Sequence, residues 1–348
     1  MRLLHLKLQN FRNYQAIDFS FKKQVTVLTG ENAQGKTNFL ESIYLLATTK
    51  SIKADKDEEL IKEGEDFLRV EGEVENSETT SLEVAMLLQN DKLTKKTKVN
   101  GIPRRSIDYC IHLAVVFFTP ENINIVTGSP SLRRYHIDQT LSQTDREYKK
   151  TLTAYENIVV RKNRILKAIQ EGLAGRDQLT YWIDQQILLG NVLTEKRRAY
   201  FEKINATEKK FGPFKYLYKP SEITLERWRE YEVKEIASAN SLIGPHRDDF
   251  GFFYEDRDLS KYGSRGEQRT AVLDLKFSEV EFIESLLLQR PILLLDDIFS
   301  ELDSSHRQHV IDLAFQQQTI IASVDWDEIL AESLKEAEIV QVKAGNFV

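Results

Sequence analysis

The fold of this chain is decided by the stretch Gly30-Glu31-Asn32-Ala33-Gln34-Gly35-Lys36-Thr37, which has the pattern G-x-x-x-x-G-K-T of a phosphate-binding P-loop. The β-branched run at 25–28 predicts a buried strand before the loop. Apolar residues at helical spacing over 39–47 predict a helix after it. Because the motif has the context that it needs, we expect the loop N–H groups and Lys36 to bind nucleotide phosphates. The Thr37 hydroxyl is then a candidate ligand for Mg²⁺.

Composition limits the class of protein. A chain of 348 residues corresponds to about two domains, and a hydrophobic fraction of 41% suffices for a sizeable core. The formal net charge of -6 means that any nucleic-acid site must be a local patch. The single cysteine, Cys110, allows no disulfide within the chain. Because the sequence has no signal-peptide pattern and no membrane-length apolar run, we expect a cytoplasmic protein without a membrane partner.

Two alternating apolar segments, at 4–8 and 17–21, open the chain and predict a strand hairpin. Its turn contains Arg12, just before a strand that returns toward the P-loop. Two interpretations of this arginine stay open at this point. It is either a solvated turn residue or a cation close to the phosphates.

The middle of the chain differs in pattern from both ends. From Arg133 to about Phe211 the pattern is helical and highly charged, and Gly172 and Gly175 separate two long segments. These segments predict two antiparallel helices joined by a short turn. We therefore expect an inserted, mostly helical second lobe in a discontinuous nucleotide domain. The predicted bounds are 1–130 and 241–348 for the ATPase domain and 131–240 for the inserted lobe.

Two further segments provide an anion site and a pair of carboxylates. Ser264 and Glu267 form the S-x-x-E capping box of a helix, which places Ser264 and Gly266 at an exposed helix N-terminus. The apolar run at 292–295 predicts a strand of a parallel sheet, and it ends at the pair Asp296-Asp297. Ligands of α/β sheets collect at the carboxyl ends of strands. One carboxylate can hold Mg²⁺, and the other can orient an attacking water.

A group of cations surrounds the dipeptide Asn100-Gly101, which predicts a type I′ hairpin. The ribbon either contacts nucleic-acid phosphates or carries lysines that protect an edge strand. The loop at 244–249 also has two interpretations. His246 and Arg247 either contact a phosphate or a partner, or they are held by the neighbouring aspartates. The ribbon cations are Lys95, Lys96, Lys98, Arg104 and Arg105.

Together these motifs resemble the ABC-type ATPases. The P-loop corresponds to a Walker A motif, 264–267 to a signature, the strand ending at Asp296-Asp297 to a Walker B motif, and 300–303 to a D-loop. The N-terminal Asn-Phe-Arg-Asn resembles ABC-type ATPases that act on DNA, such as the chromosome-maintenance proteins. Three further segments resemble the RecF family of recombination mediators. They are 118–135, 244–249 and 294–303.

This resemblance implies a fold, an activity and partners. It implies an α/β ABC-type P-loop ATPase head, a mixed sheet with helices, that carries the inserted helical lobe. RecF-like proteins bind ATP and Mg²⁺ and form an ATP-dependent homodimer with two nucleotides between the protomers. The dimer binds double-stranded and gapped DNA and works with RecO and RecR to load RecA. Slow ATP hydrolysis then releases it, so a weak ATPase activity is implied.

The same resemblance implies roles for individual residues. Thr37 and Asp296 take the metal, and Asp297 is the catalytic carboxylate. Arg12 contacts a phosphate in cis. The signature residues, which contact ATP in trans, are Ser264, Arg265, Gly266 and Glu267. The D-loop residues are Ser300 and Asp303. The remaining ATP contacts are Gly30, Glu31, Asn32, Ala33, Gln34, Gly35, Lys36 and Asn38. The DNA candidates come instead from the charge pattern: they are the ribbon cations Lys95, Lys96, Lys98, Arg104 and Arg105, with Arg133 and Arg134 next in line.

The chain departs from the usual ABC pattern at several positions. Asp297 stands where transporter-type members have glutamate, so its shorter reach predicts slow turnover. Val324 stands near the switch histidine and cannot hydrogen-bond a phosphate, which leaves Ser323 as the candidate. The usual Q-loop glutamine has no clear counterpart around Glu121, and Asn122 replaces a common aspartate.

Three competing classes have specific counter-arguments. A transporter's nucleotide-binding subunit is disfavoured by the inserted helical segment. A chromosome-structural ATPase would need a long heptad coiled coil, for which 133–211 is too short. An ordinary monomeric P-loop enzyme such as a kinase would not need the signature at Ser264.

Overall fold

The computed structural model describes residues 1–299, 302, 304–324 and 334–348. The chain forms two compact units. Unit 1 consists of Met1–Asn122 and Glu279–Val348, and unit 2 of Ile123–Ser278. The predicted domain bounds return to the ATPase domain earlier, at 241. The structure keeps the following segment in unit 2 because β10 (Asp249–Tyr254) pairs antiparallel with β9 (Phe214–Lys219) along its whole length.

A six-stranded, mostly parallel sheet carries the P-loop. Its strand order is β15-β14-β3-β13-β12-β8, and only the short β15 is antiparallel to its neighbour. The central strands are buried at almost every residue, as expected for continuous apolar runs covered on both faces. The strand bounds are β3 (Val25–Thr29), β8 (Val115–Phe118), β12 (Ile292–Asp296), β13 (Thr319–Ser323), β14 (Glu338–Lys343) and β15 (Asn346–Phe347).

A second, antiparallel sheet in unit 1 has the order β2-β1-β4-β5-β6-β7. The predicted N-terminal hairpin is confirmed as β1–β2. The Asn100-Gly101 turn is also confirmed, since both residues have positive φ and Val99 pairs directly with Ile102. The strands are β1 (Arg2–Phe11), β2 (Tyr14–Ser20), β4 (Phe67–Glu75), β5 (Thr79–Gln89), β6 (Lys92–Val99) and β7 (Ile102–Arg104).

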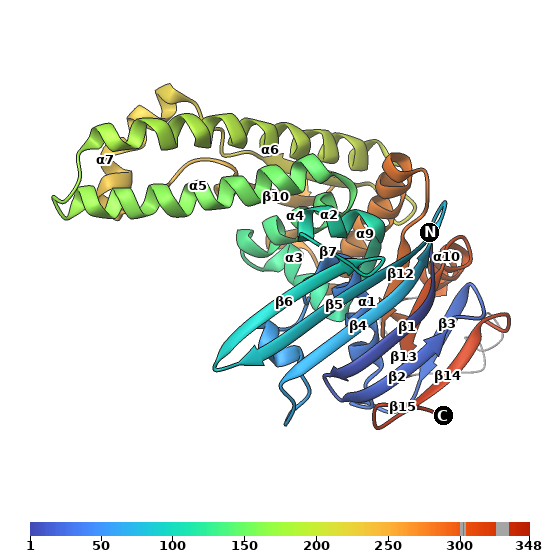
Figure 1. The fold of residues 1–348 in the computed structure, drawn as a ribbon. Helices are drawn as coiled ribbons and strands as arrows, with labels where there is room; N and C mark the ends of the chain where they lie inside the picture. Colours follow the sequence, from blue (N-terminus) through green and yellow to red (C-terminus); the bar gives the residue numbers. More distant parts are fainter. Residues whose placement is uncertain (300–301, 303, 325–333) are drawn as a thin grey trace. The chain divides into compact units, whose positions relative to one another are not determined.

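Helix α1 (Lys36–Thr48) follows the P-loop and packs against strands of both sheets (Figure 1). Phe39, Ile43 and Leu46 of this helix are fully buried in one core with residues of the two sheets. Burying a side chain of this size contributes about 1.5–3 kcal/mol, so the core holds the start of α1, and with it the P-loop, in place. The short helices of unit 1 are η1 (Asp57–Leu60), α2 (Ser106–Tyr109), η2 (Cys110–His112) and α10 (Ser304–Ala314).

Unit 2 is mostly helical, as predicted for the inserted lobe. Helices α5 (Arg146–Gln170) and α6 (Thr180–Ala206) run antiparallel side by side (Figure 1). One face of α5 is buried at Tyr148, Leu152 and Tyr155. Helix α9 (Arg265–Leu287) begins in unit 2 and ends in unit 1. The other elements are α4 (Pro130–Thr144), α7 (Leu225–Ser238), η5 (Pro245–Arg247), β11 (Arg257–Asp258), α8 (Leu259–Tyr262), α3 (Asn124–Thr127), η4 (Arg176–Leu179) and, at the junction with unit 1, η3 (Pro120–Ile123).

The loop at 244–249 is bonded within unit 2, which favours the structural interpretation of its residues. The buried Arg197 guanidinium donates to the Asp248 carboxylate at 2.8 Å and to the Pro245 carbonyl at 2.7 Å. His246 Nδ1 lies 2.7 Å from the Tyr155 hydroxyl, and burial lowers the His246 pKa to about 4. Arg247 donates to the Ser241 carbonyl. Among the described residues, no helix is both long and apolar enough to cross a bilayer.

Candidate nucleotide-binding site

The P-loop leaves β3 and enters α1 through three residues in the left-handed region. Gly30 has φ 143°, Ala33 62° and Gly35 118°. Lys36 Nζ donates to the carbonyls of Gly30 at 2.7 Å and Glu31 at 2.8 Å, so the ammonium lies across the loop. Burial lowers the pKa of Lys36, while the nearby carboxylates of the Walker B pair act in the opposite direction. The loop therefore has a cation held beside the backbone of a helix N-terminus.

Thr37 and Asp296 meet although they are 259 residues apart in the sequence. The Thr37 hydroxyl donates to Asp296 Oδ1 at 2.7 Å. Asp296 is the last residue of β12 and is 4% exposed. Burial raises the pKa of its carboxyl group, because the charged form is poorly solvated there. The structure thus brings together two hard oxygen atoms of the kind that Mg²⁺ takes as ligands.

Asp297 lies one residue beyond the end of β12, in a strained backbone conformation. Its φ is 50°, which is uncommon for a residue other than glycine. Its N–H donates to the Ala322 carbonyl at 2.8 Å, so the neighbouring strand holds the turn. Its charge acts on Lys36, which places the two groups in the same electrostatic site. Strain of this kind is common at functional sites.

Lys53 is a residue of this site for which the sequence gives no signal. It lies in the loop after α1, and its Nζ is 3.7 Å from Asp296 Oδ2 and 3.3 Å from Glu121 Oε1. In the sequence it belongs to an ordinary charged loop, 50–57, whose path no pattern predicts. The structure makes Lys53 a second cation beside the Asp296 carboxylate, and Lys53 also pairs with Glu121.

Arg12 is bonded to Glu41 of helix α1. Its Nε and Nη2 donate to the two carboxylate oxygens at 3.0 and 3.1 Å, and Nη1 donates to the Glu59 carbonyl at 2.9 Å. Glu41 is fully buried, so this bidentate pair satisfies a charge inside the protein. The predicted contact between Arg12 and a phosphate stays a prediction.

The signature segment has the predicted capping box. The Glu267 N–H donates to the Ser264 hydroxyl at 3.2 Å, and the Ser264 N–H donates to Glu267 Oε2 at 2.8 Å. The hydrogen bonds to Ser264 and the ion pair with Arg257 lower the pKa of Glu267. Ser264, Arg265 and Gly266 are exposed at the start of α9. The D-loop residues Ser300 and Asp303 lie outside the described residues.

The cations of the predicted DNA ribbon point to opposite faces of β6. Lys95 lies on the inner face, where it donates to the Thr49 carbonyl at 2.8 Å and pairs with Asp57. Lys98 pairs with Glu83 of the neighbouring strand at 3.0 Å. Lys96, Arg104 and Arg105 are exposed, and Arg105 lies 3.7 Å from Asp108. The exposed cations are therefore the ones that suit a phosphate contact.

Arg133 and Arg134 are engaged within unit 2. Arg133 is 8% exposed and donates to Asp249 Oδ1 at 2.6 Å and to the Gly128 carbonyl at 2.8 Å. Arg134 donates to the Asp248 carbonyl at 2.8 Å. These contacts hold α4 to the start of β10 and to the residue before it. The DNA role of both arginines stays a prediction.

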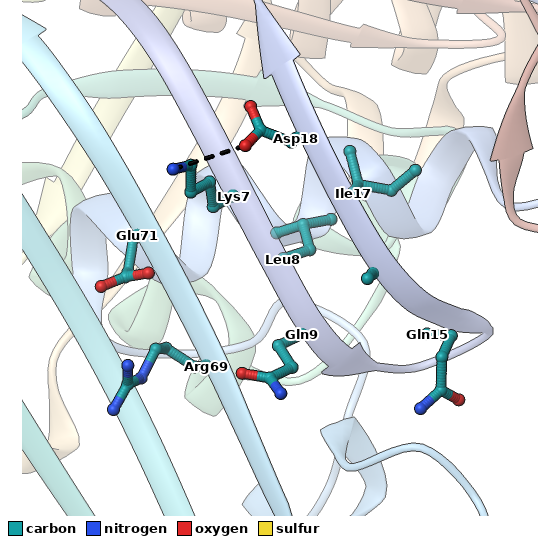
Figure 2. A pocket seen from close by; sticks show the side chains of 9 residues that line it. Lys7, Leu8, Gln9, Gln15, Ile17, Asp18, Arg69 and Glu71 are labelled. Carbon is teal, nitrogen blue, oxygen red and sulfur yellow. Dashed lines mark ion pairs between the residues drawn. The ribbon is translucent and has the colours of Figure 1, made fainter.

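A groove of about 440 Å³ is lined by residues of β1, β2 and β4, most of which have polar or charged side chains. Figure 2 shows Lys7 paired with Asp18, and Arg69 and Glu71 on the adjacent strand. The lining mixes both signs of charge and contains none of the P-loop or Walker B residues. It is therefore separate from the nucleotide site.

Comparison with known proteins identifies the family of this chain. Residues 2–345 match the RecF/RecN/SMC N terminal domain. The DNA replication and repair protein RecF of Bacillus cytotoxicus is 34% identical over 372 residues, which cover 99% of this chain and 98% of that protein. The protein of the same name from Halalkalibacterium halodurans is 36% identical and is covered to 99%. The chain belongs to the RecF family.

Solved structures agree with this assignment. The structure of the recombination mediator protein RecF-ATP in the RecFOR pathway has a TM-score of 0.90 and 28% identity, with 99% of this chain and 96% of that chain covered. The head of an Smc protein bound to the C-winged helix domain of ScpA has a TM-score of 0.53 and 15% identity, and it shows the fold alone. The predicted α/β head of an ABC-type ATPase is thereby confirmed for this RecF family member.

Proposed function

We propose that this RecF family member is an ATP-dependent recombination mediator, in which ATP drives a dimer that binds DNA and slow hydrolysis releases it. The observation that carries the proposal is the contact between Thr37 and Asp296, which joins the P-loop to the end of the Walker B strand. The identity to RecF proteins over nearly the whole chain supports it, as does the likeness to a RecF-ATP structure.

The residues around Asp296 fit a magnesium ion. The donor set consists of a hydroxyl and a carboxylate oxygen only 2.7 Å apart, which suits a hard cation. Burial of Asp296 disfavours its charged form unless a cation lies close by, and Lys53 partly fills this need at 3.7 Å. Thr37 and Asp296 would hold Mg²⁺. When bound, the ion neutralises the charge that develops on the phosphates.

The P-loop supplies the phosphate site. Its N–H groups at the start of α1 attract anions, and Lys36 already lies beside the loop carbonyls of Gly30 and Glu31. To bind a phosphate, the ammonium exchanges these neutral acceptors for charged oxygens, which are the stronger partners. Lys36 thereby fixes the β- and γ-phosphates.

Asp297 is proposed as the catalytic carboxylate. It follows the proposed metal ligand directly and shares an electrostatic site with Lys36. Its left-handed backbone turns it away from the regular strand direction, and the bond to the Ala322 carbonyl holds this turn. From there it orients water, or accepts a proton from it, during attack on the γ-phosphate. Its side chain is one methylene shorter than glutamate, which is consistent with a weak ATPase.

The signature at Ser264 is proposed to complete the site of a second copy of the chain. Ser264 and Gly266 are exposed at the N-terminus of a 23-residue helix, and an added Cβ at Gly266 would meet nothing within 4 Å. This surface is open to a phosphate from a partner protomer. Two nucleotides would then lie between two protomers, each bound by one P-loop and one signature.

The proposed partners follow from the family. We infer that the ATP-bound dimer binds double-stranded DNA at gaps and works with RecO and RecR to help load RecA. The relatives' names, which concern DNA replication and repair and the RecFOR pathway, support this inference. The exposed cations Lys96, Arg104 and Arg105 are the proposed DNA contacts.

Measurement of molecular mass in solution tests the proposal. The protein should be monomeric without nucleotide, dimeric with Mg²⁺ and ATP, and bound as a dimer to gapped duplex DNA. A protein that stays monomeric with saturating ATP and gapped DNA would contradict the proposed dimer. A protein that binds no ATP would contradict the whole proposal.

A further inference from the structure

The peptide between Gln34 and Gly35 in the P-loop is fixed by hydrogen bonds from residues near both ends of the chain. The Gln34 carbonyl accepts a hydrogen bond from Asn13 Nδ2 at 3.0 Å and another from the Gly345 N–H at 3.0 Å. The Gln34 side-chain oxygen accepts from the Ala344 N–H at 2.7 Å. Asn13 lies in the β1–β2 turn, and the other two donors lie in the β14–β15 turn. Neither turn belongs to the P-loop motif.

The two carbonyl contacts fix the direction of the Gly35 N–H. A trans peptide is planar, so its C=O and its N–H point in opposite directions, and the chain contains no cis peptide among its described residues. With the Gln34 oxygen bound to the two turns, the Gly35 N–H points away from them. Without these bonds this peptide could flip, because Gly35 has no side chain to prevent it. A flipped peptide would present a carbonyl in place of an amide.

The packing around the loop leaves no room for side chains. A Cβ on Gly35, which has φ 118°, would lie 2.6 Å from Asn13 Nδ2, and a Cβ on Gly30 would lie 2.4 Å from the Val342 carbonyl. Gly345 itself has φ 73°, and its Cβ would lie 2.7 Å from the Asn13 carbonyl. The three glycines therefore allow the close approach of the β1–β2 turn and of the β14–β15 hairpin to the loop.

We propose that Asn13 and the β14–β15 hairpin together form a positioning element that locks the Gln34–Gly35 peptide, so that the Gly35 amide faces the nucleotide phosphates. The inference rests on the proposed nucleotide site. Asn38 supports the lock, because its Nδ2 donates to Asn13 Oδ1 at 2.8 Å and so turns the Asn13 NH₂ group toward Gln34. Asn13 is a positioning residue, since it acts on the phosphates only through the Gly35 amide.

The substitution Asn13→Asp tests the lock. One carboxylate oxygen keeps the bond from Asn38, while the other faces the Gln34 carbonyl and repels it. Asn13→Ala removes the donor without adding charge, which separates loss of the lock from repulsion of phosphates by a new carboxylate. Asn90→Asp in the exposed β5–β6 turn is the matched control for an added charge. The measurements are the ADP dissociation constant, the melting temperature without nucleotide, and the ¹⁵N–¹H resonance of Gly35.

We expect Asn13→Asp to weaken ADP binding about tenfold or more, and Asn13→Ala to weaken it less, because the Gly345 N–H remains. The Gly35 resonance should move in both, while Asn90→Asp leaves affinity and resonance unchanged.

An unchanged ADP affinity in both Asn13 variants would overturn the proposal. So would a lowered melting temperature with normal affinity and an unmoved Gly35 signal. If Asn13→Asp does not fold, Asn13→Ala is judged by the same measurements. Wild-type protein that binds no ADP would instead contradict the proposed function, and the Gly35 resonance would still report on the lock.

Discussion

The Thr37 hydroxyl and the Asp296 carboxylate are hydrogen-bonded at 2.7 Å across 259 residues of sequence. This contact links the start of α1 to the end of β12, and it joins the two segments of unit 1 that are separated in the sequence by unit 2. Its functional consequence is that a carboxylate reaches the P-loop only when both segments of unit 1 are in place.

The substitution Asp297→Asn should slow ATP hydrolysis by about 10²–10⁴-fold, because the amide cannot accept a proton from water. ATP and Mg²⁺ should still bind, since Thr37 and Asp296 are intact. The dimer should therefore persist, and release from DNA should slow. A hydrolysis assay together with a DNA-dissociation assay checks this. Asp296→Asn is the control, because it should impair hydrolysis and also weaken the Mg²⁺-dependent dimer. Wild-type turnover in the Asp297 variant would move the catalytic role elsewhere.

Replacement of Lys36 by methionine should weaken ATP binding by about ten- to hundredfold, since charge-assisted contacts to the phosphates are typically worth about 1.5–3 kcal/mol. No ATP-driven dimer should then form. Calorimetric titration with ATP measures the first effect and light scattering the second. The variant should keep its melting temperature without nucleotide, because the hydrogen bonds of Lys36 within the described part of the chain go to the loop carbonyls of Gly30 and Glu31. Normal ATP affinity would rule out the assignment.

A bulky cation at the signature should separate nucleotide binding from dimer formation. In Ser264→Arg the P-loop is untouched, so the monomer should bind ATP with nearly wild-type affinity. The arginine should block the approach of a second protomer, and mass measurements with ATP should show only monomer. Ser260→Arg on the neighbouring short helix α8 is a control for an added surface cation. If the Ser264 variant dimerises normally, the trans contact is wrong.

The neighbours Lys95 and Lys96 offer a matched pair for the DNA surface. Lys96→Glu, on the exposed face of β6, should weaken binding to all duplex sequences and reduce the salt dependence by about one phosphate contact, without a change in ATP affinity. Lys95→Glu should instead lower the melting temperature, because the new carboxylate faces Asp57. Filter binding over a salt series and thermal unfolding distinguish the two. If the salt dependence of DNA binding is unchanged in Lys96→Glu, the lysines of the ribbon would instead be interpreted as protection of an edge strand.

Acidification should destabilise the fold through His246. Its pKa is lowered to about 4 in the folded protein, against 6.5 in an unfolded chain. Between these values the unfolded state binds the extra proton, so the stabilisation is complete above pH 6.5 and is lost as the pH falls toward 4. The free energy of unfolding should drop by about 2 kcal/mol from this group between pH 7.5 and pH 5. Denaturant titrations at both pH values should show a smaller drop in His246→Gln. Equal drops in both proteins would contradict this assignment.

Sequence reasoning succeeds here where the signal is local. The P-loop with its strand and helix, the capping box at Ser264 and the Asn100-Gly101 turn each depend on residues close in sequence, and the structure has all three. The apolar run that ends at Asp296 also predicted a buried strand of the parallel sheet correctly, because a continuous apolar run identifies such a strand without knowledge of its neighbours.

The features that sequence reasoning missed depend on contacts between distant residues of ordinary type. Lys53 belongs to no motif. Asn13 ends the Asn-Phe-Arg-Asn stretch, but that stretch gives no sign of a contact with Gln34, and only the folded chain brings Lys53 to Asp296 and Asn13 to Gln34. The sequence analysis treats the cations of β6 as one phosphate-contacting set. The alternation of side chains along a strand, however, already assigns Lys95 and Lys96 to opposite faces. The predicted inserted lobe ends at 240, whereas unit 2 continues to Ser278, and no local pattern reveals that β10 pairs with β9.

The order of strands around β3 has a consequence for synthesis on the ribosome. β3 is made early, but both strands that flank it, β13 and β14, are made only after all of unit 2. At ordinary elongation rates the P-loop strand waits tens of seconds for its hydrogen-bond partners, while the contiguous unit 2 can already fold. The same delay applies to Asp296 and to the hairpin that holds Gln34. A nascent chain should therefore bind nucleotide tightly only after the residues of β13 and β14 have been made.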